Sequence, residues 1–305
     1  MSDTTIDKDL EEEKDDSSED EEGDDEGNES EPPPRKDETD SRSAAQKPRN
    51  ALRVERGPAA VWMLNVWTIA KRELASYFNS PLAYIVISMS LVGIGLWCFY
   101  KQGYWQVDRA SYTQLFGELP ALFCIFTAPL FTMRSLSEER RLGTLELLIT
   151  LPVRDSEVIL GKFLGAFTMV TIQILLLAAY PLAMFVWPFH LGAFDWGPFW
   201  AAIFGMVLMA GAGTAIGMMF SGFTESQILS FFATSATLAA LFFVGYAVQY
   251  VPGPPGDVLS FFSFQSRYEA FAKGVIDTRA VVYFLSIAVL ALLVAFRTLE
   301  SRKWK

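Results

Sequence analysis

The chain has 305 residues, 51% of them hydrophobic, and its mean hydropathy is +0.25 despite a formal net charge of −10. The first fifty residues hold 20 acidic and 7 basic side chains, which leaves 15 acidic and 18 basic ones in the remaining 255. The acidity therefore belongs to the N-terminal segment, while the apolar, nearly neutral remainder excludes a uniformly water-soluble protein and indicates a membrane protein.

Residues 1–55 are predicted to be a disordered acidic tail. The segment is rich in Asp, Glu and Ser, contains prolines from Pro32 to Pro34, and offers few apolar side chains to offset the entropy of ordering. A tail that binds basic partners or cations is the alternative to a solvated, self-repelling extension, which we favour. The negative charge and the lack of a following apolar run argue against a signal peptide.

Residues 61–79 show the periodicity of an amphipathic helix. Its apolar stripe consists of Met63, Trp67, Ala70, Leu74 and Tyr77, and its polar face of Asn65, Thr68, Arg72, Ser76 and Asn79. Tryptophan suits the headgroup boundary, and Lys71 and Arg72 would meet anionic lipid there. The sequence therefore predicts an interfacial helix in the membrane surface, with a helix packed on a soluble domain as the alternative.

Six apolar stretches follow, each judged against the roughly 20 residues that a helix needs to cross a bilayer. They are residues 82–100, 116–133, 158–187, 198–220, 227–250 and 280–296. Pro129 lies inside the second stretch, which is expected to be kinked. The predicted fold class is all-α, with a six-span transmembrane domain over residues 82–305.

The basic residues of the loops predict the orientation of these spans. One side of the membrane receives Lys71, Arg72, Arg134, Arg140, Arg141, Arg154, Lys162, Arg297, Arg302, Lys303 and Lys305. The other side receives Lys101, Arg109, Arg267, Lys273 and Arg279. Because basic loops remain in the cytoplasm, both termini and the segment 134–157 are predicted to be cytoplasmic.

Residues 134–157 form a charged amphipathic segment between two apolar stretches. Ser135 and Glu138 have the S-x-x-E spacing of a capping box, which predicts a helix start, and Pro152 is expected to end the helix. Its apolar face would hold Leu142, Leu145 and Ile149. Periodicity alone leaves two interpretations open, an ordinary interfacial helix and an element that docks another subunit.

Small residues mark one face of the fourth apolar stretch. Gly205, Gly213 and Gly217 would let another helix approach closely, so we expect this face to be covered by another span or by a second subunit. The short turn that follows carries Glu225 and is predicted to form a second, smaller cytoplasmic contact.

Residues 251–279 are predicted to form a re-entrant or interfacial hairpin on the outer side. The segment opens with PGPPG, which interrupts a helix, and continues as an apolar and amphipathic sequence. Arg267 and Glu269 are candidates for an outer gate or substrate contact, and a local ion pair at the lipid boundary is the favoured alternative.

The residue inventory contains no pattern typical of a catalytic or metal site. His190 is the only histidine, which excludes HExxH and multi-histidine zinc sites, and Cys98 and Cys124 are expected to be inert thiols inside spans. Gly161-Lys162 is followed by Phe163 and lacks the upstream glycine of a phosphate-binding loop. An ATP-driven device would therefore need its ATPase on another chain.

Several segments together resemble a known family of membrane proteins. They are RSLSEERRLGTLELLITLPV (134–153), KRELASYFNSPLAYI (71–85), FTESQI (223–228), EAFAKGVIDTRAVVYF (269–284) and LESRKW (299–304). The chain resembles the ABC-2 type permeases, the membrane subunits of ATP-binding-cassette transporters, from about Leu64 to the C-terminus. The last segments look closest to the gliding-motility-associated branch, and they are also similar to the permease of the nitrous-oxide-reductase maturation system.

The resemblance implies a permease without enzymatic activity in a bacterial inner membrane. Its partners would be an ABC ATPase subunit, which binds ATP and Mg, a second permease copy or a paralogous permease, and membrane lipid, with no nucleic acid. The residues that would dock the ATPase, through a coupling helix, are Glu138, Glu139, Arg140, Gly143, Thr144, Leu145 and Glu146. ATP hydrolysis on the partner would drive export or transmembrane movement of an unidentified substrate. A structural anchor for a motility or secretion apparatus is the alternative.

Overall fold

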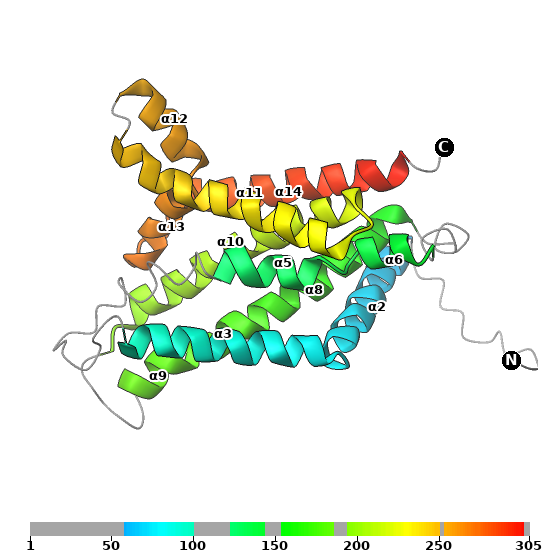
Figure 1. Cartoon of the computed structure of the whole chain (residues 1–305), viewed down its shortest axis with the longest axis horizontal. Helices are drawn as coiled ribbons and strands as arrows, with labels where there is room; N and C mark the ends of the chain where they lie inside the picture. The colour runs from blue at the N-terminus through cyan, green and yellow to red at the C-terminus, as the bar shows by residue number, and fades with distance from the viewer. Residues whose placement is uncertain (1–57, 101–122, 144–153, 186–193, 251–252, 302–305) are drawn as a thin grey trace, which may run out of the picture. The chain divides into compact units, whose positions relative to one another are not determined.

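The computed structural model describes residues 58–100, 123–143, 154–185, 194–250 and 253–301, and the regular structure within these ranges is entirely helical (Figure 1). Four continuous helical segments are long and apolar enough to cross a membrane. They are α8 (Asp155–Leu177) with its continuation α9 (Ala179–Phe185), α10 (Trp196–Phe223), α11 (Gln227–Ala247) and α14 (Thr278–Glu300). The prediction of an all-helical protein with several apolar spans is confirmed at this level.

A fifth candidate span is broken. It combines α2 (Pro58–Phe78) with α3 (Pro81–Tyr100), which are bent by 72° relative to each other. Pro81 begins α3, where a missing N–H costs little, because the first helical N–H groups have no partner within the helix. The predicted span over residues 116–133 is described only from the π-helical turn η2 (Phe123–Thr127) and α5 (Ala128–Thr132) onward. A total of six spans therefore stays a prediction, as does the tail, since residues 1–55 lie outside the described residues.

Helix α10 occupies the centre of the packed helices and has the most buried apolar window of the four, at 72%. It packs along α14 and also contacts α8, α11, α13 and α5. A Cβ on Gly205 would lie 2.6 Å from Phe271, and one on Gly217 would collide with Thr132 of α5. The expectation that other helices cover this face is confirmed, and the covering helices belong to the same chain.

The segment after α11 and the 3₁₀ turn η3 (Val248–Tyr250) forms two short helices, α12 (Pro254–Phe262) and α13 (Phe264–Ala272). They meet at Ser263, whose hydroxyl accepts a hydrogen bond from Ser266 N at 3.1 Å and so caps α13. Tyr268 and Phe271 of α13 are 1% and 0% exposed, because α13 packs against α10 and α11. Two helices with a break agree with a hairpin, and its depth in a membrane stays a prediction.

Helix α2 packs along α8, and this contact takes up one residue of its predicted polar face, Asn65. Asn65, expected on the water-facing side, donates a hydrogen bond to Glu157 of α8 at 3.1 Å, while Met63 and Trp67 of the apolar stripe are 67% and 66% exposed. The reason is a glycine pair in α8: a Cβ on Gly161 or Gly165 would lie 2.7 Å from side chains of α2. Close approach at these glycines brings Val66, Ile69, Ala70 and Glu73 of α2 against α8. Thr68, Arg72, Ser76 and Asn79 of the predicted polar face remain exposed, and the place of α2 in the membrane surface stays a prediction.

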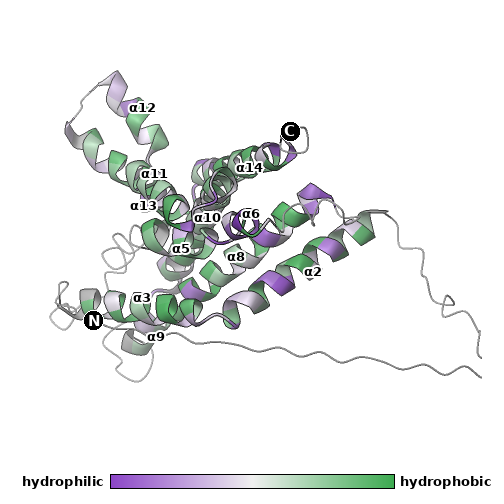
Figure 2. Cartoon of the chain, turned by 45° about the vertical axis from the view of Figure 1, so that its right-hand side comes forward, coloured by the Kyte–Doolittle hydropathy of each residue, from purple (hydrophilic) through white to green (hydrophobic). Residues whose placement is uncertain are grey.

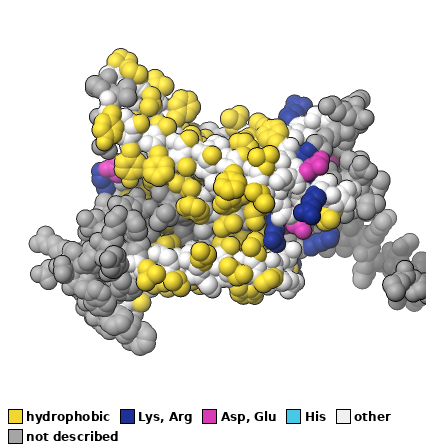
Figure 3. All heavy atoms as spheres, viewed as in Figure 1, with side chains coloured by type: hydrophobic (Ala, Val, Ile, Leu, Met, Phe, Trp, Pro, Cys, Tyr) yellow, Lys and Arg dark blue, Asp and Glu magenta, His cyan; other side chains and the backbone are white. Residues whose placement is uncertain are grey.

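Hydrophilic residues recur along α2 and α6 (Ser137–Arg141), whereas α3 and α11 are mostly hydrophobic (Figure 2). In the space-filling view, charged side chains gather near the end of the helices where α6 lies, and hydrophobic side chains cover much of the described surface between the ends (Figure 3). Leu136, Ile159, Met218 and Leu299 form a small separate core at that end, which joins the α6 region to α8, α10 and α14. This end of the helices holds the candidate site.

Candidate functional site: the α6 segment and its cavity

The α6 segment, defined here as residues 134–143, begins its helix at Ser137 and not at the predicted capping box. Ser221 of α10 supplies the cap, because its Oγ accepts hydrogen bonds from the backbone N–H groups of Leu136 and Ser137, both at 3.0 Å. Ser135 instead donates its hydroxyl to the sulfur of Met218. The capping-box prediction is wrong because a side chain from a distant helix satisfies the orphan donors.

The helix α6 ends at Arg141, earlier than predicted. Gly143 follows in the left-handed region with φ of 68°, a conformation that stops a helix and favours glycine. Thr144, Leu145 and Glu146 lie outside the described residues, as does the predicted stop at Pro152.

Arg140 fastens α6 to the end of α10 and to the turn that follows it. Its guanidinium donates a hydrogen bond to the carbonyl of Gly222, in the last turn of α10, and lies 4.0 Å from the carboxylate of Glu225. The Arg140 side chain is 6% exposed, while that of Glu225 is 65% exposed. The two predicted cytoplasmic contacts, 134–157 and the turn at Glu225, therefore touch each other.

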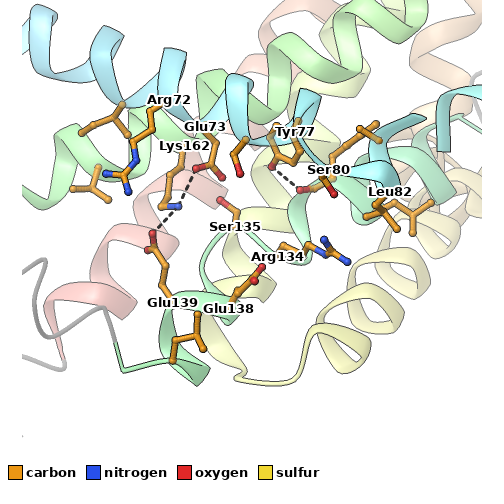
Figure 4. A pocket seen from close by; sticks show the side chains of 17 residues that line it. Arg72, Glu73, Tyr77, Ser80, Leu82, Arg134, Ser135, Glu138, Glu139 and Lys162 are labelled. Atoms are coloured by element: carbon orange, nitrogen blue, oxygen red, sulfur yellow. Dashed lines mark hydrogen bonds and ion pairs between the residues drawn. The ribbon is translucent and has the colours of Figure 1, made fainter. Parts of the chain in front are cut away.

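Glu139 fastens α6 to α8 and α2 through a buried lysine. Lys162 Nζ lies 2.9 Å from Glu139 and 3.2 Å from Glu73, and its side chain is only 7% exposed (Figure 4). The two carboxylates keep 26% and 19% exposure. A buried ammonium between two carboxylates is compensated, and removing the lysine would leave two carboxylates without their cation. This group of three is called the Lys162 triad below.

A cavity of about 470 Å³ opens beside the Lys162 triad, between α2, the start of α3, α5, α6 and α8. Its polar lining includes Arg72, Glu73, Ser76, Tyr77, Ser80, Arg134, Ser135, Glu138, Glu139 and Lys162 (Figure 4). Its apolar lining includes Ile69, Leu82, Ala83, Leu130, Phe131, Leu142 and Val158. Tyr77 closes one side by donating a hydrogen bond to the carbonyl of Phe131 at 2.7 Å.

Four of the predicted docking residues, Glu138, Glu139, Arg140 and Gly143, lie within the described part of the chain, and they differ in what they face. Glu139 and Arg140 face inward and hold α6 in place, and Glu138 lines the cavity. Gly143 is exposed, and next to it the structure exposes Arg141 and Leu142, the latter at 66%. An exposed leucine beside a basic residue and a glycine turn is a surface that another protein can contact.

The outer candidates Arg267 and Glu269 do not pair with each other. Glu269 binds Lys273, one helical turn later, at 2.6 Å. Arg267 lies over the rings of Phe261 and Tyr283, at 5.1 and 5.6 Å from their centroids. A local ion pair forms here, but between Glu269 and Lys273, because residues two apart on a helix do not face each other. The guanidinium of Arg267 lies over the rings of α12 and α14 instead.

Sequence reasoning missed Ser221, Lys162 and Glu73 as parts of this site. The spacing Gly161-x-x-x-Gly165 is a small-residue motif that predicts a close helix contact, and it also places Lys162 at that contact. Nothing in the sequence near Ser221 or Glu73 indicates which distant group each one meets.

The structure defines a helical membrane protein whose charged end carries a short helix tied to several spans. The sequence matches, over residues 10–302, the family described as ABC-2 family transporter protein. The chain therefore belongs to the ABC-2 transporter family, and the match extends into the acidic segment, which the resemblance of the separate motifs had omitted.

A curated relative adds a more specific likeness. The chain is 34% identical over 105 residues to the Probable ABC transporter permease protein NosY of Pseudomonas aeruginosa. That alignment covers 33% of this chain and 38% of the relative, so the chain matches well under half of NosY. Family and relative together support a transmembrane permease of an ABC transporter.

Proposed function

We propose that this chain couples ATP hydrolysis on a separate ABC ATPase subunit to the export or transmembrane movement of a substrate, with the α6 segment as its coupling element. The observation that carries the proposal is the attachment of α6 to three long helices. Ser221 caps α6 from α10, Lys162 holds it from α8, and Glu73 extends this link to α2. A displacement of α6 by the ATPase would therefore be transmitted to α10, α8 and α2 through these contacts.

The exposed surface of the α6 segment would meet the ATPase. Arg141 presents a cation, Leu142 an apolar side chain and Gly143 a turn. Residues 144–146 follow directly in the chain. Glu139 and Arg140 take the supporting role in this proposal, because their charges are already used within the chain. ATP and Mg would bind to the partner, in keeping with the lack of a phosphate-binding loop here.

The proposal includes a location in a bacterial inner membrane with both termini in the cytoplasm, and pairing with a second permease copy or a paralogous permease. Arg140 and Arg141 belong to α6, Arg154 caps the start of α8, and Lys162 lies in the first half of α8. A cluster of basic residues on one side of the spans is what a cytoplasmic side requires. The gliding-motility-associated branch also remains part of the proposal, carried by segments 269–284 and 299–304 alone.

Co-purification with the ATPase tests this function. The full chain, solubilised from its own membranes, is expected to bring a stoichiometric ATPase subunit with it, and Leu142→Asp should lower the recovered ATPase at least tenfold. Val258→Asp is the matched control, because Val258 is 58% exposed and lies on α12. Helix α12 follows the C-terminal end of α11, whereas the turn that contacts α6 precedes the N-terminal end of α11. A chain that brings no ATPase, or equal recovery with both variants, would refute the coupling role and favour a structural anchor.

A further inference from the structure

The cavity beside α6 contains charges that the Lys162 triad does not use. Within the described residues, Arg134 and Glu138 both line the cavity and neither forms an ion pair or a side-chain hydrogen bond. The Nε atom of Arg134 is buried without a hydrogen-bond partner. A guanidinium nitrogen in this situation has lost water without gaining an acceptor, which costs free energy unless a ligand supplies one.

The remaining charges of the cavity specify what kind of ligand would fit. The Lys162 triad carries one net negative charge, since one ammonium stands between two carboxylates. Arg72 and Arg134 balance Glu138 and the triad, so the cavity lining carries no net formal charge, and a ligand with a single charge would upset this balance. A ligand with a phosphate and a nearby ammonium satisfies both signs.

The apolar wall of the cavity favours a lipid over a soluble phosphate compound. Leu82 and Ala83, at the start of α3, line the cavity, and the next residues, Tyr84 and Ile85, are 55% and 59% exposed. Exposed apolar side chains of the kind that face acyl chains therefore follow the cavity wall within the first turn of α3. Figure 4 shows Arg134 and Leu82 on the same side of the cavity, so a headgroup and the beginning of its acyl chains have adjacent places.

We infer that this cavity binds the headgroup of a zwitterionic membrane phospholipid with a primary ammonium, with its phosphate on Arg134 and its ammonium beside Glu138. The guanidinium supplies paired N–H donors for phosphate oxygens, and the glutamate carboxylate accepts from the ammonium. The bound lipid would fill the space between α2, α5 and α6. The inference does not depend on the ATPase, because it concerns only this chain and the bilayer.

Native mass spectrometry of the full chain in detergent tests the inference. The probes are dioleoylphosphatidylethanolamine, dioleoylphosphatidylglycerol and soluble O-phosphoethanolamine, each added at the same concentrations. The unmodified chain should retain one phosphatidylethanolamine, and Arg134→Gln should weaken this binding tenfold or more, because charge-assisted hydrogen bonds are lost. Glu138→Gln should remove the preference for phosphatidylethanolamine over phosphatidylglycerol.

The control is Arg141→Gln, which removes the same charge from an exposed position outside the cavity. Equal lipid retention by Arg134→Gln and Arg141→Gln would overturn the inference. Equal affinity for O-phosphoethanolamine and for the phospholipid would also overturn it, since the ligand would then be a soluble phosphate compound. If Arg134→Gln does not fold, Arg134→Lys serves instead and should bind the lipid more weakly than the unmodified chain, since an ammonium cannot make the paired contact.

Discussion

Replacing Lys162 by Met should strongly destabilise the protein. The substitution keeps most of the side-chain volume but leaves Glu73 and Glu139 facing each other without their cation. Breaking a buried ion pair typically costs 3–5 kcal/mol, and these carboxylates keep 19% and 26% exposure, so we take the lower end, about 3 kcal/mol. At about 1.4 kcal/mol per factor of ten, the unfolded fraction should rise roughly a hundredfold.

The measurement is the free energy of unfolding in mixed micelles, followed by the fluorescence of the chain's tryptophans, with Lys273→Met as the control. Lys273 and Glu269 form an even closer pair, at 2.6 Å, but their side chains are 58% and 60% exposed. An exposed pair contributes at most about 1 kcal/mol, so the control should change little. The double variant Lys162→Met with Glu139→Gln should recover part of the loss, because it removes one of the two uncompensated charges. Equal losses for Lys162→Met and Lys273→Met would refute the reasoning.

Three further predictions concern the packing and exposure of the same region. Gly165→Leu should separate α2 from α8 and lower the unfolding temperature by several degrees, because even a Cβ there would lie 2.7 Å from α2. Gly93→Leu is the control and should change the unfolding temperature little, because a Cβ on the exposed Gly93 meets nothing within 4 Å. Ser221→Ala should cost about 1–3 kcal/mol of unfolding free energy by removing the cap of α6, against little change for the exposed Ser286→Ala. Leu142→Cys, in a background without the native cysteines, should react with a membrane-impermeant thiol reagent in inside-out vesicles and not in intact spheroplasts; the reverse pattern would contradict a cytoplasmic α6.

The long helices could be predicted from sequence because each is a local property of one apolar stretch. The predicted spans 198–220 and 280–296 fall inside α10 and α14, and 227–250 covers α11 with its following 3₁₀ turn. Hydropathy sums over about twenty residues, so a single polar side chain does not change the result. The predicted Gly-lined face of α10 succeeded for a similar reason, since a small-residue face demands a close neighbour whichever helix supplies it.

The site was harder to predict because each of its contacts joins residues distant in sequence. Ser135 and Glu138 satisfy the local rule for a capping box, yet Ser221, from α10, caps the helix. At the outer hairpin the local geometry is enough: Arg267 and Glu269 are two residues apart on α13 and do not face each other, whereas Lys273 lies one turn after Glu269 and pairs with it. A local pattern states what a group needs, and the tertiary fold decides which group meets that need.

The charges around α6 also limit how this segment can move. A shift of α6 away from α8 would separate Glu139 from Lys162, and a shift away from α10 would separate Arg140 from the carbonyl of Gly222. Both separations would leave poorly exposed charged groups without their partners, which costs several kcal/mol each. A movement of α6 together with α8 and α10 keeps these contacts intact. Under the proposed function, a displacement imposed on Leu142 is therefore passed to α8 and α10 as a rigid movement. A flexible loop at the same position would absorb the displacement, and the buried pairs are what distinguish the α6 segment from such a loop.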